Sequence, residues 1–373
     1  MNARLRVVLM FGGRSVEHEV SVVSARGVAA AMRETDLECV PIGVTGDGRW
    51  LTPERSARIL GDTVPRVDPG AGDDDGEHLC LEPGGGGLVR ASRGDAIEPL
   101  ALDVLFPLVH GWGGEDGRLQ GALDLAGLPC VGAGVLASAV GMDKHVAKQL
   151  CAAAGIDVVP WQLVTNDDWQ RDAPGTAARI DGTLTYPLFV KPSNGGSSVG
   201  ITKVAEPSRL PAALETALAH DRRIVVETGL DAREIECAVL GNDRPEASGL
   251  GEIVPSSDFY DYEAKYIDGT SGLEIPARLE PELTETIRTR ALDAYRALDL
   301  AGFARVDFLL DRREGRPYLN ECNTLPGFTP ISMFPKLWEA AGLSYPGLVV
   351  RLVELALERG RVESSRMTRR EID

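Results

Sequence analysis

Two apolar runs, each followed by a glycine-containing loop and then a helical pattern, constrain the fold of this chain most. Residues 6–11 form the first run, Gly12 and Gly13 interrupt it, and small and apolar residues from 20 to 32 are compatible with a helix. Residues 102–109 form the second run, which ends at HGWGGEDG before a helical pattern resumes at Gly117. A repeated strand–loop–helix unit is typical of a parallel α/β layer, which is therefore predicted for the N-terminal part of the chain.

The rest of the chain predicts helices mixed with shorter strands. Residues 61–97 are rich in Gly and Asp and poor in apolar side chains, which favours a surface excursion. Residues 135–154 are predicted as one helix, and the segments PLFVKP, IVVE and IECAVLG indicate a smaller α+β unit. A further helix is expected from about 278 to 298. Residues 345–358 place apolar side chains on one helical face, which predicts core packing, and the charged tail from Arg359 is expected to fray.

Composition and charge limit what the chain can bind. Its 373 residues are too many for one hydrophobic core, so two or three domains are expected. The 56 acidic and 39 basic side chains give a net charge of -17, which would repel a phosphate backbone, so nucleic acid is not an expected partner. No stretch reaches the roughly 20 apolar residues of a membrane span. The six cysteines form no CxxC pair and favour free thiols in a reducing compartment, so a cytoplasmic protein is expected.

A predicted hairpin near the C-terminal end carries four polar side chains on one face. The segments GFARVDFLLD and RPYLNEC flank a polar turn, and residues two apart in a strand project to the same side. Arg305 and Asp307 should therefore lie beside Glu321 and Asn323. Carboxylate and amide oxygens are ligands that Mg²⁺ prefers, usually completed by nucleotide phosphates. The hairpin thus predicts a magnesium site, and a solvent-facing salt-bridge pair is the alternative.

The segment directly after the hairpin favours the magnesium site. NTLPGFTPISMFP contains several prolines and little periodicity, so it is expected to be an ordered irregular loop beside the carboxylates. Gly327 in this loop can offer a bare backbone N–H. A connecting turn would explain the prolines but not the convergence of polar groups, so we interpret the loop as a substrate-binding segment.

A Gly- and Ser-rich segment, KPSNGGSSVG, follows the predicted strand PLFV. Its glycines and hydroxyls can fold over phosphates, and Lys191 supplies a positive charge. The spacing matches neither the Walker A pattern nor the dinucleotide-binding fingerprint, so these two classes are not supported. The segment predicts a phosphate-binding lid, with a simple Gly/Ser hairpin turn as the alternative.

Several other segments are ambiguous when each is taken alone. Lys144 in GMDK and Glu227 at the end of IVVE could be solvated and turn residues. Glu17 follows the first strand, where α/β sheets place ligands, but it could equally be a helix-start acid. His110 in HGWGGEDG has the same ambiguity. Residues 257–269, with three tyrosines around a lysine, predict a long active-site loop or, alternatively, a surface for a protein partner.

Eight segments occur in the order found in one enzyme family. They are EHEVS, HGWGGEDG, GMDK, KPSNGGSSVG, REIECAVLG, FYDYEAKY, ARVDF and NECNTLPGFTPISM. Each is weak alone, but together they span nearly the whole chain and resemble the D-alanine–D-alanine ligases of the ATP-grasp superfamily. The resemblance implies an α/β and α+β fold of three domains. These are an N-terminal parallel-sheet substrate domain (1–140), a central ATP-grasp domain with the lid (141–228), and a C-terminal ATP-grasp domain with the metal site and substrate loops (229–373).

The resemblance also implies roles at the nucleotide and the metal. ATP would lie between the central and C-terminal domains. The lysines that match phosphate-contacting positions are Lys144, Lys191 and Lys265, and Ser197 matches the serine of the lid. Glu227 matches the residue at the adenine, and Glu234 matches the residue that holds the ribose. The matching ligands of two Mg²⁺ ions, for which Mn²⁺ could substitute, are Asp307, Glu321 and Asn323.

The implied reaction joins two D-alanines for peptidoglycan precursor synthesis, and so serves cell wall biogenesis and cell shape. The γ-phosphoryl of ATP passes to the carboxylate of the first D-alanine, and the amine of the second attacks the acyl phosphate. Arg305 and the metal would neutralise the phosphoryl group and the tetrahedral oxyanion, which the Gly327 N–H would share. The family further implies a homodimer.

Four residues surround the first D-alanine in this resemblance. Glu17 would bind its ammonium and join Ser197 and Tyr266 in a hydrogen-bonded set that links the lid to the long loop, and His110 would lie beside the same subsite. The positions that match the receptor of the second carboxylate are Ser332 and the Met333 backbone.

Two other functions remain as alternatives at this point. A D-alanine–D-lactate or D-alanine–D-serine ligase, or another ATP-grasp carboxylate–amine ligase, would share the nucleotide site but differ around Tyr266 and Ser332. The retained YEAKY pattern favours D-alanine. A non-catalytic nucleotide-binding regulator should have lost a metal ligand or Arg305, and this chain retains them.

Overall fold

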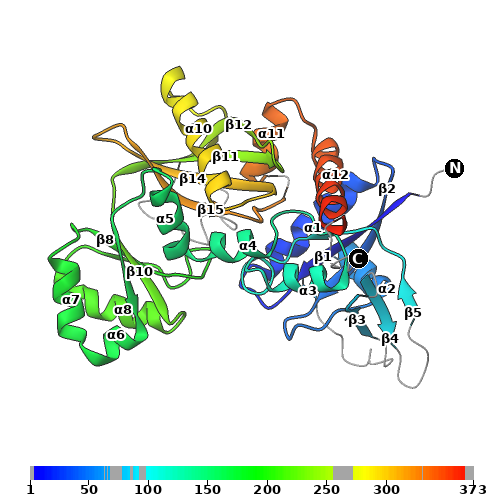
Figure 1. The fold of residues 1–373 in the computed structure, drawn as a ribbon, viewed down its shortest axis with the longest axis horizontal. Coiled ribbons are helices and arrows are strands. Elements are labelled where there is room, and N and C mark those ends of the chain that lie inside the picture. Colours follow the sequence, from blue (N-terminus) through cyan, green and yellow to red (C-terminus); the bar gives the residue numbers. More distant parts are fainter. Residues whose placement is uncertain are drawn as a thin grey trace, which may run out of the picture.

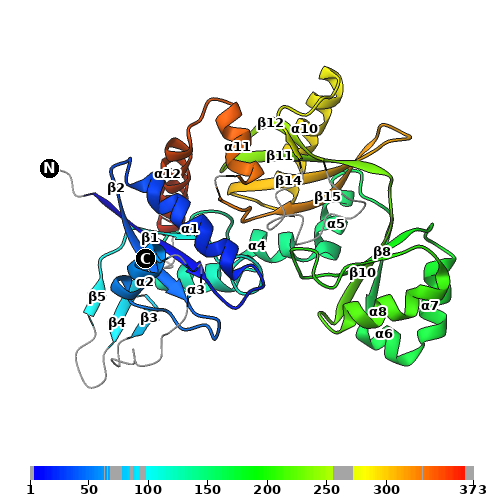
Figure 2. The same cartoon turned by 180° about the vertical axis from the view of Figure 1, so that it is seen from behind.

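The computed structural model describes residues 4–62, 64, 66–67, 78–84, 87–91, 98–254, 272–329 and 331–365. Its three larger sheets follow one another along the longest axis of the molecule (Figure 1). The N-terminal sheet lies at one end, a four-stranded sheet lies at the other end, and a five-stranded sheet lies between them, as the reverse view in Figure 2 also shows. The arrangement leaves the five-stranded sheet in a position to share a site with both neighbours.

The N-terminal sheet confirms the predicted parallel layer. Strands β1 (Leu5–Gly12), β2 (Leu37–Val44) and β6 (Val104–Pro107) pair in parallel in the order β2-β1-β6. Helices α1 (His18–Met32) and α3 (Arg118–Ala126) follow β1 and β6. The apolar run of β1 is buried on both faces, as expected for a central parallel strand.

The surface excursion predicted at 61–97 contains regular secondary structure in the part that the structure describes. Strands β3 (His78–Glu82), β4 (Gly87–Ala91) and β5 (Glu98–Leu100) form a small antiparallel sheet, preceded by helix α2 (Pro53–Gly61). Leu79 is buried and packs with Leu81 and Leu100 against the core of the N-terminal sheet. Alternate leucines therefore supply an apolar face that the overall composition of this segment conceals.

The single helix predicted over 135–154 is wrong, because the chain breaks at Asp143. Helix α4 (Val135–Met142) ends there and α5 (Lys144–Ala153) begins, with Asp143 in an extended conformation. Its carboxylate accepts a hydrogen bond from the Val146 N–H at 3.0 Å and so caps α5. The break places Lys144 in the first turn of α5.

The four-stranded sheet is antiparallel and carries helices on one side. Its strands, in the order β7-β10-β8-β9, are β7 (Trp161–Thr165), β10 (Arg223–Thr228), β8 (Leu188–Pro192) and β9 (Thr202–Val204). The helices are α6 (Asn166–Arg171), α7 (Ala173–Asp181), the 3-10 turn η1 (Pro207–Arg209) and α8 (Leu210–Leu218). The predicted lid joins β8 to β9, and so it projects from one end of this sheet.

The five-stranded sheet is covered on both faces. Its strands, in the order β13-β12-β11-β14-β15, are β13 (Gly272–Glu274), β12 (Glu246–Val254), β11 (Ala232–Gly241), β14 (Gly302–Asp311) and β15 (Pro317–Asn323). Alternate β11 residues enter two cores: one packs with α5 and α10 (Pro281–Ala297), and the other packs with α11 (Met333–Ala340) and α12 (Tyr345–Ser364). Burial on both faces explains why this segment is rich in apolar residues.

Helix α12 returns to the N-terminal part of the molecule, where it packs against α1 and β6. Its predicted apolar face is confirmed, because Leu348, Val349, Leu352, Leu355 and Ala356 are all buried. The predicted fraying from Arg359 is wrong, since the helix continues to Ser364. The Arg359 guanidinium donates to the carbonyls of Gly132 and Cys130 and so anchors the last turns.

Within the described residues, no single helix is long and apolar enough to cross a membrane, and α11 and α12 satisfy that test only together, as a pair bent by 103°. The six cysteines are free thiols, as predicted.

We expect Leu352→Ala to lower the free energy of unfolding by roughly 2–5 kcal/mol, because Leu352 is fully buried in the core that α12 shares with α1. Urea denaturation followed by circular dichroism measures the change. Val362→Ala on the same helix is the control, since Val362 is 63% exposed and its loss should change stability by less than about 0.5 kcal/mol. Equal effects of the two substitutions would contradict the shared core.

Candidate functional site

A cavity of about 550 Å³ gathers most of the residues singled out by the sequence. Loops after β1 and β6, the start of α5, the lid, strands β11, β14 and β15 and the loop before α11 all contribute to its wall. The predicted residues that line it are Glu17, His110, Lys144, Ser197, Glu234, Arg305, Asp307, Glu321, Asn323, Gly327, Ser332 and Met333. Lys191 and Glu227 are not in its lining, and Lys265 and Tyr266 lie outside the described residues.

The hairpin β14–β15 has the predicted register. Arg305 is opposite Asn323 and Asp307 is opposite Glu321, so all four residues share one face of the sheet. The Arg305 guanidinium donates from two nitrogens to the two carboxylate oxygens of Asp307, each at 2.8 Å. Its Nε also lies 3.0 Å from Oε2 of Glu236 on the neighbouring strand β11. A row of carboxylates therefore crosses three strands, with one arginine held between two of them.

The first residue of α5 connects this hairpin to the lid. The Lys144 ammonium donates to the Gly195 carbonyl at 2.6 Å and lies 3.5 Å from a carboxylate oxygen of Glu321. Lys144 thus contacts the two segments that the sequence predicts to hold phosphate and metal.

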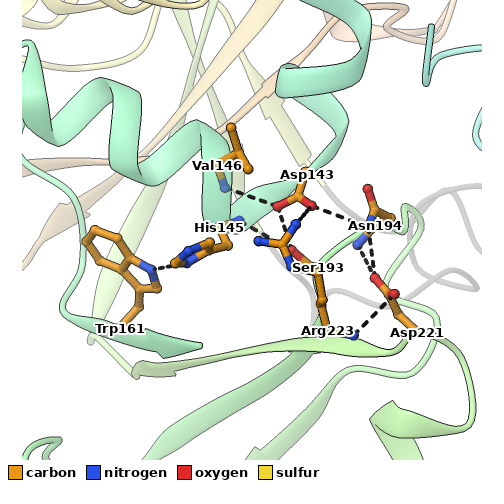
Figure 3. Close-up of polar contacts among 8 residues, drawn as sticks. All are labelled: Asp143, His145, Val146, Trp161, Ser193, Asn194, Asp221 and Arg223. Carbon is orange, nitrogen blue, oxygen red and sulfur yellow. Dashed lines mark hydrogen bonds and ion pairs between the residues drawn. The ribbon is translucent and has the colours of Figure 1, made fainter. Parts of the chain in front are cut away.

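A polar network around Asp143 holds the base of the lid (Figure 3). The Asp143 carboxylate accepts hydrogen bonds from the Ser193 hydroxyl at 2.8 Å and from the Arg223 guanidinium at 2.5 Å. Asn194 lies next to the same group and donates to Asp221 at 3.0 Å. The start of α5, the end of β8 and the start of β10 are therefore fixed to one another, so the lid extends from a rigid base.

The lid reaches the N-terminal part of the cavity through Ser197. Its hydroxyl donates to Oε1 of Glu17 at 2.5 Å, and Ser197 and Ser198 both have positive φ angles, of 50° and 61°. Such angles are uncommon for residues other than glycine and mark a sharply turned backbone. Glu17 precedes α1, but its side chain makes no capping hydrogen bond to that helix. Glu17 therefore lies in the cavity wall and contacts the lid.

His110 connects the N-terminal loop to the loop before α11. Its Nδ1 lies 3.1 Å from the Leu325 carbonyl and 3.6 Å from Oε1 of Glu115, and the side chain is buried. Burial alone would lower the pKa of His110, but the hydrogen bond and charge of Glu115, helped by Glu17, outweigh it and raise that pKa. The Nε2 atom has no hydrogen-bond partner among the described residues, although it is buried at the cavity wall. A polar group of a ligand could satisfy this atom.

Contacts within the loop between β15 and α11, and contacts from neighbouring helices, hold its described residues. The Ser332 hydroxyl oxygen accepts a hydrogen bond from the Thr329 N–H at 3.0 Å, and the Tyr345 hydroxyl donates to the Phe328 carbonyl at 2.7 Å. Met333 is buried against Gly251, where a Cβ atom would come within 2.5 Å of the Met333 sulfur. The loop thus holds Gly327 and Ser332 at the cavity wall by packing from several elements.

A second charged cluster lies beside the cavity and contains a residue that the sequence reasoning missed. The carboxylate of Glu227 contacts the ammonium groups of Lys148, at 3.0 Å, and of Lys191. Burial would raise the pKa of Glu227, but the two lysine charges outweigh it and lower that pKa to about 2. Lys148 follows Lys144 by one helical turn, and this spacing is the signal that could have found it.

Three other residues were also missed. Asp143 and Glu115 stood within quoted motifs but were not singled out, and Glu236 is two positions after Glu234 and therefore on the same face of β11. Among the residues that the structure describes, no three His, Cys, Asp or Glu side chains form a cluster suited to a metal ion. The predicted ligand set differs from such a cluster because one of its three members is an amide.

Two family models match most of the chain. The one described as D-ala D-ala ligase N-terminus matches residues 6–133, and the one described as D-ala D-ala ligase C-terminus matches residues 150–354. A D-alanine–D-alanine ligase of Deinococcus radiodurans is 49% identical over 95% of this chain and 98% of its own length. One of Acetivibrio thermocellus is 44% identical over 96% and 97%.

Solved structures agree with this relationship. The D-alanine–D-alanine ligase of Coxiella burnetii is 34% identical with a TM-score of 0.82, covering 97% of this chain and 96% of its own. The D-Ala:D-Ser ligase of Enterococcus faecalis is 35% identical with the same TM-score, covering 95% and 99%. The predicted fold class, with its N-terminal parallel sheet, is confirmed by these similarities. The chain therefore belongs to the D-alanine–D-alanine ligase family.

Proposed function

We propose that the chain ligates two D-alanines to D-alanyl-D-alanine at the expense of ATP, for peptidoglycan precursor synthesis. The observation that carries this proposal is that one cavity brings three groups of residues together. They are the Arg305–Asp307 pair of the hairpin, the Glu17–Ser197 pair, and the loop with Gly327 and Ser332. A site that must activate a carboxylate and then hold an incoming amine needs all three groups in reach of one another. Family membership supplies the identity of the substrates.

The reaction has two steps. A carboxylate oxygen of the first D-alanine attacks the γ-phosphorus, which gives an acyl phosphate and ADP. The free amine of the second D-alanine then attacks the acyl carbon, and the tetrahedral intermediate expels phosphate as the peptide bond forms. Arg305 is partly buried and charged, so it can stabilise the transferred phosphoryl group and the later oxyanion, and the Gly327 N–H can share the oxyanion.

Nucleotide contacts are assigned by position. Two lysines flank the lid: Lys144 at the start of α5 and Lys191 at the end of β8. Together with Ser197, we assign them to the phosphates of ATP. We assign Glu227 to the adenine and Glu234, which lines the cavity, to the ribose. The assignment of Lys265 to the phosphates rests on its motif alone.

The hairpin residues fit a divalent cation by their chemistry. Asp307 and Glu321 offer carboxylate oxygens and Asn323 an amide oxygen from adjacent positions, and a hard ion such as Mg²⁺ or Mn²⁺ would take its remaining ligands from phosphates and water. When bound, such an ion would neutralise charge on the transferred phosphoryl group. The Arg305 guanidinium already contacts the Asp307 carboxylate, so it would remain next to the charge of the transferred phosphoryl group. We propose this set as the site of two ions.

Substrate contacts are assigned in the same way. Glu17 would hold the ammonium of the first D-alanine, Ser197 and Tyr266 would complete the hydrogen-bonded set, and His110 would lie beside it. The carboxylate of the second D-alanine would be received by Ser332 and the Met333 backbone at the start of α11, where N–H groups and the helix dipole favour an anion.

Three further assignments complete the proposal. The domain boundaries at 140 and 228 fall close to the break at Asp143 and to the end of β10, although α12 packs with the N-terminal sheet. Two chains would form a homodimer, as the family implies. The need for ATP supports a location in the cytoplasm.

A coupled assay of ADP release over a panel of D-amino acids and D-lactate tests the substrate assignment. We expect turnover with D-alanine alone and a product that mass spectrometry identifies as the dipeptide. Turnover that requires D-serine or D-lactate as second substrate would instead favour the D-Ala:D-Ser type of ligase that a similar solved structure represents. ATP binding without turnover on any substrate would favour a non-catalytic regulator.

We expect Ser197→Ala to lower kcat/KM for D-alanine by roughly 10- to 100-fold, because it removes a hydrogen bond to the charged Glu17 that ties the lid to the substrate subsite. Steady-state kinetics at saturating ATP measures the change. Ser208→Ala is the matched control: its hydroxyl also donates to a glutamate, Glu206, at 2.9 Å, but on the exposed surface. If both variants keep normal kinetics, the Glu17–Ser197 contact has no part in substrate binding.

A further inference from the structure

Lys148 is a buried lysine to which neither the sequence motifs nor the proposed function assigns a role. Its side chain on α5 is 3% exposed, and its ammonium lies 3.0 Å from Oε2 of Glu227, which is 2% exposed. A buried lysine is costly unless a negative charge accompanies it, so Lys148 and Glu227 each depend on the other as a counter-charge.

The same carboxylate has a second partner that is more exposed than the first. Oε1 of Glu227 contacts the ammonium of Lys191, whose side chain is 13% exposed at the base of the lid. Lys191 and Glu227 belong to neighbouring strands, with Lys191 paired to Val225, so their contact is local to the sheet. Lys148 reaches Glu227 from a helix whose other residues Ala147 and Cys151 are fixed in the core of the five-stranded sheet. Lys191 is the more exposed of the two lysines and lies at the base of the lid, so it is the one placed to turn toward a nucleotide while Lys148 stays in the core.

The charges of the three groups explain what the second lysine does. Two ammonium groups and one carboxylate carry a net charge of +1, so one ammonium is in excess of what Glu227 requires. When Lys191 turns to the phosphates of a nucleotide, Glu227 keeps Lys148 and no buried charge is left alone. If Lys148 were absent, the same movement would leave a buried carboxylate without a counter-charge.

We propose that Lys148 is a positioning residue that holds Glu227 so that Lys191 is released to bind ATP. This inference rests on the proposed ATP-dependent function and on the assignment of Lys191 to the phosphates. It makes Lys148 the permanent partner of Glu227 and Lys191 an exchangeable one. Lys148 is buried and is not part of the cavity wall, so its role is assigned through Glu227 and not through a contact of its own.

The test is nucleotide binding by Lys148→Met in the absence of D-alanine, measured by isothermal titration with ATP and Mg²⁺. We expect a Kd for ATP roughly 100-fold higher than that of the wild-type chain, since binding must now strand a buried charge. At saturating ATP, kcat and the KM for D-alanine should stay within about threefold of the wild-type values. Lys203→Met, which removes an exposed lysine from strand β9 of the same sheet, is the matched control and should bind ATP normally.

A second variant separates this role from a structural one. Since Glu227 is itself assigned to the adenine, the reference is Glu227→Gln alone, in which no buried carboxylate remains for Lys148 to accompany. Adding Lys148→Met to Glu227→Gln should therefore raise the Kd for ATP by no more than about threefold. A purely structural lysine predicts instead that Lys148→Met weakens ATP binding to the same extent in both backgrounds. Lys148→Gln, which keeps a hydrogen-bond donor but no charge, should share the defect of Lys148→Met and replaces it if that variant does not fold.

The outcomes distinguish the role of Lys148 from the proposed ATP-dependent ligase function. A wild-type chain that binds no ATP would overturn the proposed function. A wild-type chain that binds ATP and makes dipeptide, while Lys148→Met binds ATP equally well, would overturn only the role of Lys148. So would a Lys148→Met substitution that weakens ATP binding as much in the Glu227→Gln background as in the wild-type chain.

Discussion

Replacing Glu321 by Gln is expected to slow dipeptide formation by roughly 1,000-fold, which corresponds to about 4 kcal/mol of transition-state stabilisation. The substitution removes one negative charge while keeping the size of the side chain. Glu321 lies opposite Asp307 in the hairpin, where a divalent cation would need both carboxylates. Initial rates of phosphate release, with D-alanine and ATP saturating, measure the loss.

Stability and metal binding provide the checks on this variant. The melting temperature should change little, because Glu321 is partly exposed and Lys144 keeps its hydrogen bond to the Gly195 carbonyl. Binding of Mn²⁺ with ADP present, followed by electron paramagnetic resonance, should weaken in parallel with activity. Glu314→Gln, in the exposed turn of the same hairpin, should leave both unchanged. Near-normal turnover of Glu321→Gln would remove the case for a metal site here.

Replacing Arg305 by Lys is expected to lower kcat by roughly 100-fold while leaving the KM for ATP largely unaltered. Lysine keeps the positive charge, but it has no planar fork and cannot contact Asp307 with two nitrogens while also reaching Glu236. The donor would therefore be misplaced relative to the oxyanion. Single-turnover measurements that separate acyl phosphate formation from peptide bond formation locate the affected step.

Arg316→Lys is the matched control for Arg305. Arg316 belongs to the turn of the same hairpin and also pairs with a carboxylate, Asp157, but both side chains are substantially exposed. Exposed pairs of this kind contribute little, so kcat and stability should remain near the wild-type values. If Arg305→Lys behaves like Arg316→Lys, then Arg305 serves only as a counter-ion for Asp307.

Features that depend on neighbouring residues were predictable from sequence. The hairpin is the clearest case, because side chains alternate along each strand and a short turn leaves few registers, so Arg305, Asp307, Glu321 and Asn323 had to share a face. The parallel N-terminal layer and the buried face of α12 followed in the same way from local periodicity. The order of the motifs along the chain was enough to indicate the family.

Features that depend on distant residues were not predictable. The helical pattern continues through Asp143, and the chain breaks there where Asp143 bonds to Ser193 and Arg223, which are 50 and 80 residues away. The helix beyond Arg359 is anchored by carbonyls more than 200 residues earlier. A local pattern holds no information about such partners.

The sequence by itself determined the fold class, the family, the hairpin with its four polar residues and the kinds of side chain available for phosphoryl transfer. Only the tertiary structure decided which charges neutralise one another: Ser197 meets Glu17, Arg305 is shared between Asp307 and Glu236, and Glu227 has two lysines. The physical reason is that the strength of a charge pair depends on distance and burial, and both are set by how separate elements pack. Lys148 is unremarkable in the sequence for that reason, and its burial beside Glu227 gives it a testable role.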